Sequence, residues 1–246
     1  MEALEIAAGV AVLAGAALQS ATGFGFALTS APLVFAAVAS EEAVWLLIAL
    51  GLIVNLMTLG TEGRRPQPLV RDSLIMLGWG IPGVVAGVFA LRALDSTSLQ
   101  IGVTLGVFAT LAVRALAQRR DAGVGRPPPW AAPVAGFTSG VLTTSTNTSG
   151  PPVVLYGLAR GATPVQTRDT LTVTFIGFAL LGGAALALGG ADAPDVATFA
   201  ALAPAAVAGH LIGRPVFARI ADRHYEPVLT AVLIATALAG LATALL

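Results

Sequence analysis

A strongly polar stretch inside an otherwise apolar chain limits the fold more than any other feature of this sequence. Residues 138–152 read Thr-Ser-Gly-Val-Leu-Thr-Thr-Ser-Thr-Asn-Thr-Ser-Gly-Pro-Pro. Such a stretch is too polar to face lipid, and it has too little charge for an ordinary solvated linker. At membrane depth, a non-helical backbone is stable only where protein buries it or water lines it. Residues 138–152 therefore predict a break between two short helices, inside a membrane protein.

The composition supports a membrane protein. Hydrophobic residues make up 56% of the 246 residues, charged residues only 11%, and the mean hydropathy is +0.86. A soluble domain carries about 25% charged residues. The zero net charge gives no reason to expect a nucleic-acid partner. With no Cys and two His, neither a metal site nor a cofactor is expected. The N-terminus lacks the basic region of a signal peptide, so the first apolar run is expected to stay in the membrane.

Ten apolar segments follow one another along the chain. Their approximate bounds are 4–20, 25–39, 43–60, 73–93, 98–117, 130–143, 150–159, 169–190, 196–217 and 227–245. A helix needs about 20 apolar residues to span the bilayer, so the segments at 130–143 and 150–159 are too short. We expect them to be half-helices of a re-entrant hairpin. A second polar stretch, residues 19–32, separates the first two segments and predicts a corresponding break.

Arginine positions predict the orientation, because cytoplasmic loops collect positive charge. Four clusters mark one side of the membrane: Arg64, Arg65 and Arg71; Arg119, Arg120 and Arg126; Arg160 and Arg168; and Arg214, Arg219 and Arg223. Ten alternating segments then place both termini outside a cytoplasmic (inner) membrane. Arg92 is the one exception, because it lies near a turn predicted to be outside.

The two breaks lie near the starts of two halves. We predict a first transmembrane repeat at residues 1–117, a cytoplasmic linker at 118–129 and a second repeat at 130–246. Each half has about five segments, and this odd number inverts the second half relative to the first. The predicted fold is therefore an all-α polytopic membrane protein of two inverted repeats, each starting with a broken or re-entrant helix. Broken helices at corresponding places in inverted repeats are typical of secondary transporters that bind substrate at the midplane.

The residues at these breaks resemble the TauE/SafE family, the sulfite-exporter-like permeases also called TSUP. The first half carries Gln19-Ser20-Ala21-Thr22-Gly23-Phe24-Gly25-Phe26 and, further on, Pro32-Leu33; the second carries Gly136-Phe137, Gly140 and Asn147-Thr148-Ser149-Gly150-Pro151-Pro152. The resemblance covers the whole chain. The second half departs from the commoner Gly-Gly-Gly pattern of the family, which bears on the substrate more than on the fold. The resemblance implies transport of a small sulfur-containing or organic anion, such as sulfite or a sulfonate.

Interrupted helices can bind an anion without basic side chains, because a helix N-terminus carries partial positive charge and free N–H groups. One half-helix is expected to begin at Gly150, where two prolines suit the first turn, and another near Gly23 and Gly25. Hydroxyls and amides around both starts add hydrogen-bond donors. The alternative is that these hydroxyls only satisfy freed backbone groups and pack helices. The predicted substrate-binding residues are Gln19, Ser20, Thr22, Gly23, Gly25, Thr144, Ser145, Thr146, Asn147, Thr148, Ser149 and Gly150.

His210 and Arg214 lie inside the segment at 196–217, where an ionisable residue is a functional candidate. His210 is a candidate for proton coupling, since imidazole titrates near neutral pH, and Arg214 for neutralising the anion. The alternatives are a neutral His210 bonded to a carbonyl and an Arg214 that snorkels to the interface. No acidic residue is expected inside a segment; Asp169 should pair with Arg168 or cap its helix. Asn55 should form a helix–helix hydrogen bond.

Three functions remain open, and a secondary transporter is the preferred one. No Walker-type loop is present, so the chain itself is not expected to use ATP. An anion channel would share every feature. An intramembrane hydrolase would use Ser139 or Ser149 as nucleophile and His210 as base, but a nucleophile needs its base within hydrogen-bond reach. We therefore predict a non-enzyme whose partners are a small anion and the lipid bilayer. The identity of the anion, the direction, the coupling ion and homo-oligomer formation stay open.

Overall fold

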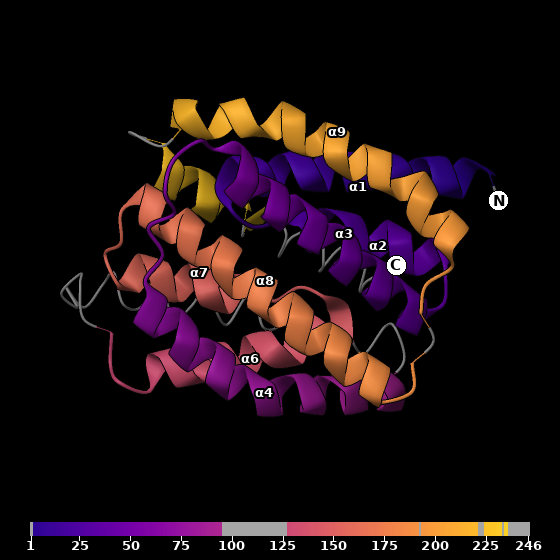
Figure 1. Cartoon of the computed structure of the whole chain (residues 1–246), viewed down its shortest axis with the longest axis horizontal. Helices are drawn as coiled ribbons and strands as arrows, with labels where there is room; N and C mark the ends of the chain where they lie inside the picture. The colour runs from indigo at the N-terminus through magenta and orange to yellow at the C-terminus, as the bar shows by residue number, and fades with distance from the viewer. Residues whose placement is uncertain (1, 95–126, 192, 221–223, 233, 236–246) are drawn as a thin grey trace.

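The computed structural model describes residues 2–94, 127–191, 193–220, 224–232 and 234–235, and all regular structure in these residues is helical. The residues at 225–232 form a last helical stretch. The main helices, seen in Figure 1, are α1 (Glu2–Thr22), α2 (Phe26–Ala37), α3 (Ser40–Thr61), α4 (Val70–Ala93), α6 (Ala131–Thr146), α7 (Gly150–Ala159), α8 (Pro164–Leu188) and α9 (Val196–Ile220).

Five helices in the described part of the chain are long and apolar enough to cross a membrane, namely α1, α3, α4, α8 and α9. The helices α2 and α7, of 12 and 10 residues, are apolar but too short to cross. These lengths confirm an all-α polytopic membrane protein with short helices at the two predicted breaks.

Most predicted segments agree with the helices, and the segment at 150–159 coincides with α7. The predicted start at residue 169 is wrong, because α8 begins at Pro164. Thr163 caps this helix: Gln166 N donates to Thr163 Oγ1 at 3.2 Å, and Thr163 N donates to Gln166 Oε1 at 3.1 Å. The segment at 98–117, most of the linker at 118–129 and the last part of 227–245 lie outside the described residues.

The two ends of the helix bundle differ in charge. The arginine-rich end contains the 62–69 loop and the start of α8, with Arg64, Arg65, Arg71, Arg160 and Arg219. The acidic end contains the starts of α3 and α9, with Glu41, Glu42 and Asp195. Arg92, the exception to the predicted orientation, lies at the acidic end and donates from Nε to Glu41 Oε1 at 2.8 Å. Its charge is therefore paired there.

Close backbone contacts join α4 to α6 and α1 to α9, while α3 and α8 lie between these two pairs (Figure 1). A Cβ atom added at Gly83 would overlap the backbone of Phe137, and one at Gly213 would overlap the backbone of Ala17. Small residues at such contacts let membrane helices approach closely. In the predicted repeat, α1 corresponds to α6, and α9 corresponds to α4. The α1–α9 pair would therefore match the α6–α4 pair. The repeat itself stays a prediction.

Candidate functional site

The first break, between α1 and α2, depends on two glycines with positive φ. Gly23 has φ of 93° and Gly25 has φ of 108°, values that residues with a side chain rarely adopt. Thr22 closes the turn locally, because its Oγ1 donates to Phe24 O at 2.7 Å. The chain therefore reverses just after α1 and enters α2 at Phe26.

The carbonyls at the end of α1 would lack hydrogen bonds at membrane depth, where each unsatisfied group costs several kcal/mol. Two residues from the second half satisfy them. Arg168 Nη2 donates to Ser20 O at 2.6 Å, and Tyr225 OH donates to Thr22 O at 2.7 Å. Arg168 is fully buried and also forms an ion pair with Glu62. A cation at this position stabilises the negative end of the α1 dipole.

The second break, between α6 and α7, turns at Asn147, which adopts the left-handed conformation with φ 56° and ψ 20°. Asparagine tolerates this region better than other residues with side chains. The N–H groups of Asn147 and Thr148 donate to last-turn carbonyls of α6 at 3.1 Å each, which satisfies the end of that helix. Ser139 Oγ donates to Ser149 O at 2.9 Å and ties the two arms of the hairpin together.

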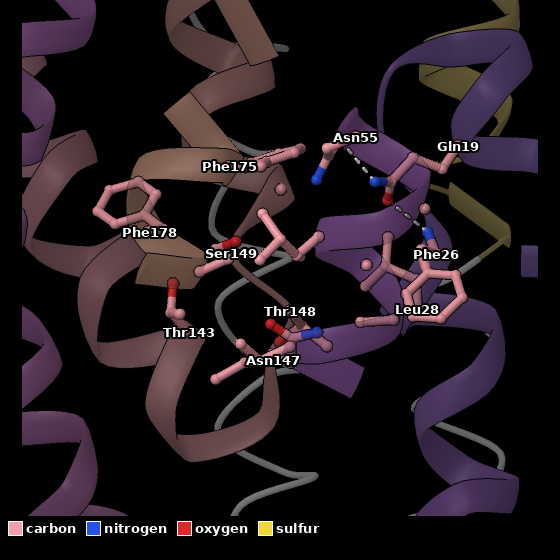
Figure 2. Close-up of a pocket in the computed structure, with 17 residues that line it drawn as sticks. Gln19, Phe26, Leu28, Asn55, Thr143, Asn147, Thr148, Ser149, Phe175 and Phe178 are labelled. Carbon is pink, nitrogen blue, oxygen red and sulfur yellow. Dashed lines mark hydrogen bonds between the residues drawn. The ribbon is translucent and has the colours of Figure 1, made fainter. Parts of the chain in front are cut away.

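The two breaks meet at one cavity (Figure 2). Within the described residues, no charged side chain lines it. Its volume is about 40 Å³, which leaves room for a few water molecules or one compact anion. The polar lining side chains are Gln19, Asn55, Thr143, Asn147, Thr148 and Ser149, and the aromatic ones are Phe26, Phe175 and Phe178.

Both short helices, α2 and α7, begin at this cavity, and neither N-cap residue supplies a side-chain cap. At α2, Phe26 N donates to Gln19 Oε1 at 3.2 Å, while the N–H groups of Ala27 and Leu28 make no hydrogen bond to any described residue. At α7, the two prolines that follow Gly150 have no N–H, which leaves the Gly150 amide as donor. The positive ends of two helix dipoles therefore act on one cavity.

Half of the predicted substrate-binding residues lie in the lining, and they come from both breaks: Gln19, Gly25, Asn147, Thr148, Ser149 and Gly150. The others lie in or beside the breaks but outside the lining: Ser20, Thr22, Gly23, Thr144, Ser145 and Thr146. Thr144 Oγ1 donates to Val84 O at 2.7 Å, and Ser145 Oγ donates to Val141 O at 2.8 Å. These two hydroxyls satisfy backbone carbonyls, as the alternative interpretation expects.

His210 is fully buried on α9, outside the cavity lining. Its Nδ1 lies 2.8 Å from Ser20 Oγ, and its Nε2 lies 3.1 Å from Thr61 Oγ1. Its partners are thus hydroxyls and not the carbonyl that the alternative expected. Since a hydroxyl can donate or accept, both the neutral and the protonated ring can keep two hydrogen bonds. Arg214 is exposed on α9 and does not line the cavity, a position that fits snorkelling.

The geometry contradicts the arrangement that the hydrolase alternative requires. Ser139 bonds to a carbonyl of the same hairpin, and the two ring nitrogens of His210 are bonded to Ser20 and Thr61. Among the described residues, neither Ser139 nor Ser149 is bonded to His210. The predicted nucleophile and base are therefore not paired.

Asn55 and Arg168 make contacts at the site that the sequence does not predict. The helix–helix hydrogen bond expected of Asn55 is confirmed, since Gln19 Nε2 donates to its Oδ1 at 2.9 Å, but Asn55 also lines the cavity. Arg168 was expected in a cytoplasmic loop and instead lies inside α8, with its guanidinium 4.0 Å from the centre of the Phe217 ring. The Thr163-Pro164 pair was the available signal, because it marks a helix start that places Arg168 in the second turn.

An ion-pair network lies at the arginine-rich end, beside the first break. Asp169 accepts from Arg64 Nη1 at 2.6 Å, from Arg64 Nη2 at 2.8 Å and from Gln67 N at 2.7 Å. This hydrogen-bonded carboxylate raises the pKa of Arg64 above its ordinary value. Asp169 neither pairs with Arg168 nor caps α8, and it is only 1% exposed inside that helix. Both expectations for Asp169, and the expectation of no acidic residue inside a segment, are therefore wrong.

The sequence matches the family described as "Sulfite exporter TauE/SafE" over residues 7–240. Comparison with curated proteins and with solved structures gave no significant match. The match extends through both breaks, the cavity and all helices named above. The chain therefore belongs to the sulfite exporter TauE/SafE family, a family of membrane transporters.

Proposed function

We propose that this chain is a secondary transporter of a small oxyanion, of the sulfite or sulfonate class, and that the cavity between the two breaks is its binding site. One observation carries the proposal: α2 and α7, from opposite halves of the chain, both begin at one cavity whose described lining has no charged side chain. Amide donors at helix N-termini favour an anion at such a place. The family match supports the same substrate class.

The size of the cavity supports a compact guest. A volume of about 40 Å³ suits an anion of a few heavy atoms better than a long organic acid. The aromatic side chains Phe26, Phe175 and Phe178 lower the polarity of the lining, which strengthens hydrogen bonds between the donors and the guest. The absence of a fixed cation in the described lining also favours release, since a buried ion pair would hold the anion too tightly for rapid turnover.

We infer that transport proceeds by alternating access between two packed units. The backbone contacts at Gly83 and Gly213 support this mechanism, because they hold each helix hairpin against its own partner helix. Relative rocking of such units around a fixed central site is the usual motion of transporters with broken helices. His210 is the proposed proton-coupling residue, linked through Ser20 to the break that carries Gln19.

The proposed location is the cytoplasmic membrane, with the arginine-rich end inside and the N-terminus outside. The charge difference between the two ends supports this orientation. The C-terminus, which the alternating segments also place outside, lies beyond the described residues. We propose no enzymatic activity, because neither Ser139 nor Ser149 is bonded to His210 and they form no catalytic pair with it.

The test is transport of radiolabelled sulfite by the purified protein in proteoliposomes. We expect uptake above protein-free liposomes and accelerated exchange when unlabelled sulfite is preloaded. Such counterflow distinguishes a carrier from an anion channel, which would conduct without exchange. If neither sulfite nor any short sulfonate enters the liposomes, the proposed function is wrong.

A further inference from the structure

The side-chain amide of Asn55 is buried in the second half of α3, and its nitrogen has no partner among the described residues. Asn55 is 4% exposed, and its Oδ1 accepts the hydrogen bond from Gln19 Nε2 at 2.9 Å. Figure 2 shows its nitrogen turned away from Gln19, towards the cavity. Among the described residues, Nδ2 has no hydrogen-bond partner. Nδ2 lines the cavity, so its two N–H groups are available to a molecule bound there.

The backbone determines which end of this amide faces the cavity. Phe26 N is a fixed donor at the start of α2, and it requires an acceptor, which Gln19 Oε1 provides at 3.2 Å. The NH₂ group of Gln19 is thereby turned towards Asn55 and requires an acceptor in turn. Only Oδ1 of Asn55 can supply it, which leaves Nδ2 for the cavity. A reversed Asn55 amide would bring two NH₂ groups face to face.

We propose that the Asn55 amide donates directly to the transported oxyanion, and that Gln19 holds it in this donor orientation. The inference rests on the proposed function and adds a contact residue to its site. Together with the backbone amides of Ala27, Leu28 and Gly150, which have no partner among the described residues, Asn55 gives the cavity donors on several sides. Such a lining selects a guest whose oxygens accept hydrogen bonds, which is the chemistry of sulfite and of small sulfonates.

The substitution Asn55→Asp keeps the helix contact and removes the donor, and the negative charge of the carboxylate also repels a bound anion. Aspartate keeps an oxygen for the Gln19 NH₂ group but presents an acceptor, in place of the N–H groups, to the cavity. Asn55→Leu, of similar size, removes both interactions. The matched control is Thr58→Val, one turn later on α3: Thr58 is 3% exposed, bonds to Val54 O at 2.8 Å and does not line the cavity.

The measurement is the KM for radiolabelled sulfite in proteoliposomes, with thermal unfolding of each variant as the check on folding. Loss of a hydrogen bond to a charged group predicts a KM raised about 10- to 100-fold in N55D, while T58V keeps the KM of the unsubstituted protein. A folded N55D with unchanged KM overturns the inference. This holds even if N55L transports poorly, because Asn55 would then serve only to join two helices. If N55D does not fold, N55L decides: an unchanged KM overturns the inference, and a raised KM supports it only where the melting temperature stays that of the unsubstituted protein. Absence of transport by the unsubstituted protein overturns the proposed function itself.

Discussion

The guanidinium of Arg168 donates from Nη2 to the carbonyl oxygen of Ser20 at 2.6 Å and so joins residues 148 positions apart. This bond ends α1 inside the protein, since it satisfies a carbonyl that no residue of α1 itself can reach. It also links the first break directly to α8 in the second half. The position of the broken helix, and thus of the cavity, therefore depends on a residue far away in sequence.

Replacement of Arg168 by Met should destabilise the protein by about 1–3 kcal/mol, because it leaves Ser20 O without its donor and removes one of the two arginines that pair with Glu62. Thermal unfolding in detergent measures this effect. The control is Arg65→Met, since Arg65 is exposed at the same end, and we expect a change within about 0.5 kcal/mol. Equal melting temperatures for the two variants would show that Arg168 does not hold the first break.

Replacement of Asn147 or Thr148 by Leu should abolish sulfite transport while membrane insertion continues, because both residues line the cavity at the second break. Leucine also strains the left-handed backbone at residue 147, so Asn147→Gly is the sharper variant: glycine accepts this conformation and removes only the amide. We expect Asn147→Gly to unfold close to the temperature of the unsubstituted protein and to lose most transport. Full transport in both Leu variants would show that the second break is not part of the substrate-binding site.

Gly51→Ala should narrow the cavity without disturbing the fold. An added Cβ would lie 3.5 Å from the Phe26 ring and 3.9 Å from Asn147 Nδ2, which are ordinary contact distances. We therefore expect larger anions to lose more transport than sulfite does, measured as the ratio of their KM values in proteoliposomes. The matched substitution Gly60→Ala on the same helix meets nothing within 4 Å and should leave the ratio unchanged. If the unsubstituted protein, Gly51→Ala and Gly60→Ala all give the same KM ratio, the cavity beside Gly51 does not limit the size of the anion.

Gly83→Ala should separate α4 from α6 and cost about 1–3 kcal/mol, because the added Cβ overlaps the Phe137 backbone, which cannot move aside as a side chain can. Gly78→Ala, on the same helix with open space around it, is the control and should be neutral or slightly stabilising. Thermal unfolding compares the two. If Gly83→Ala is as stable as Gly78→Ala, then α4 and α6 do not form the tightly packed unit that the proposed alternating access requires.

His210→Ala should remove the pH dependence of sulfite uptake between about pH 5 and pH 8, the range in which imidazole titrates. If His210 carries the coupled proton, uptake by the unsubstituted protein increases as the pH falls and the ring becomes protonated. The control is His224→Ala, since His224 is the other histidine of the chain and is exposed. An unchanged pH profile in His210→Ala would make the Ser20–His210–Thr61 contact purely structural.

Much of the site could be predicted from local sequence, because the breaks have local causes. Gly23, Gly25 and Asn147 adopt backbone conformations that their residue types allow, and the prolines after Gly150 suit the first turn of a helix. The start of α8 also has a local signal, the Thr163 capping box, but the apolar pattern alone predicts a start near residue 169. The later start predicts Arg168 in a loop and Asp169 at the helix end, whereas both lie inside α8.

The sequence alone determined that the chain lies in a membrane, where its helices are interrupted and which end collects arginine, because these properties depend on neighbouring residues and on total apolarity. Only the tertiary structure decided which hydroxyls face the cavity and which satisfy carbonyls. It also decided that Asn55 turns its nitrogen inward and that Arg168 ends α1. These outcomes depend on hydrogen-bond partners from distant helices, and no local pattern specifies a partner that the fold alone brings within 3 Å.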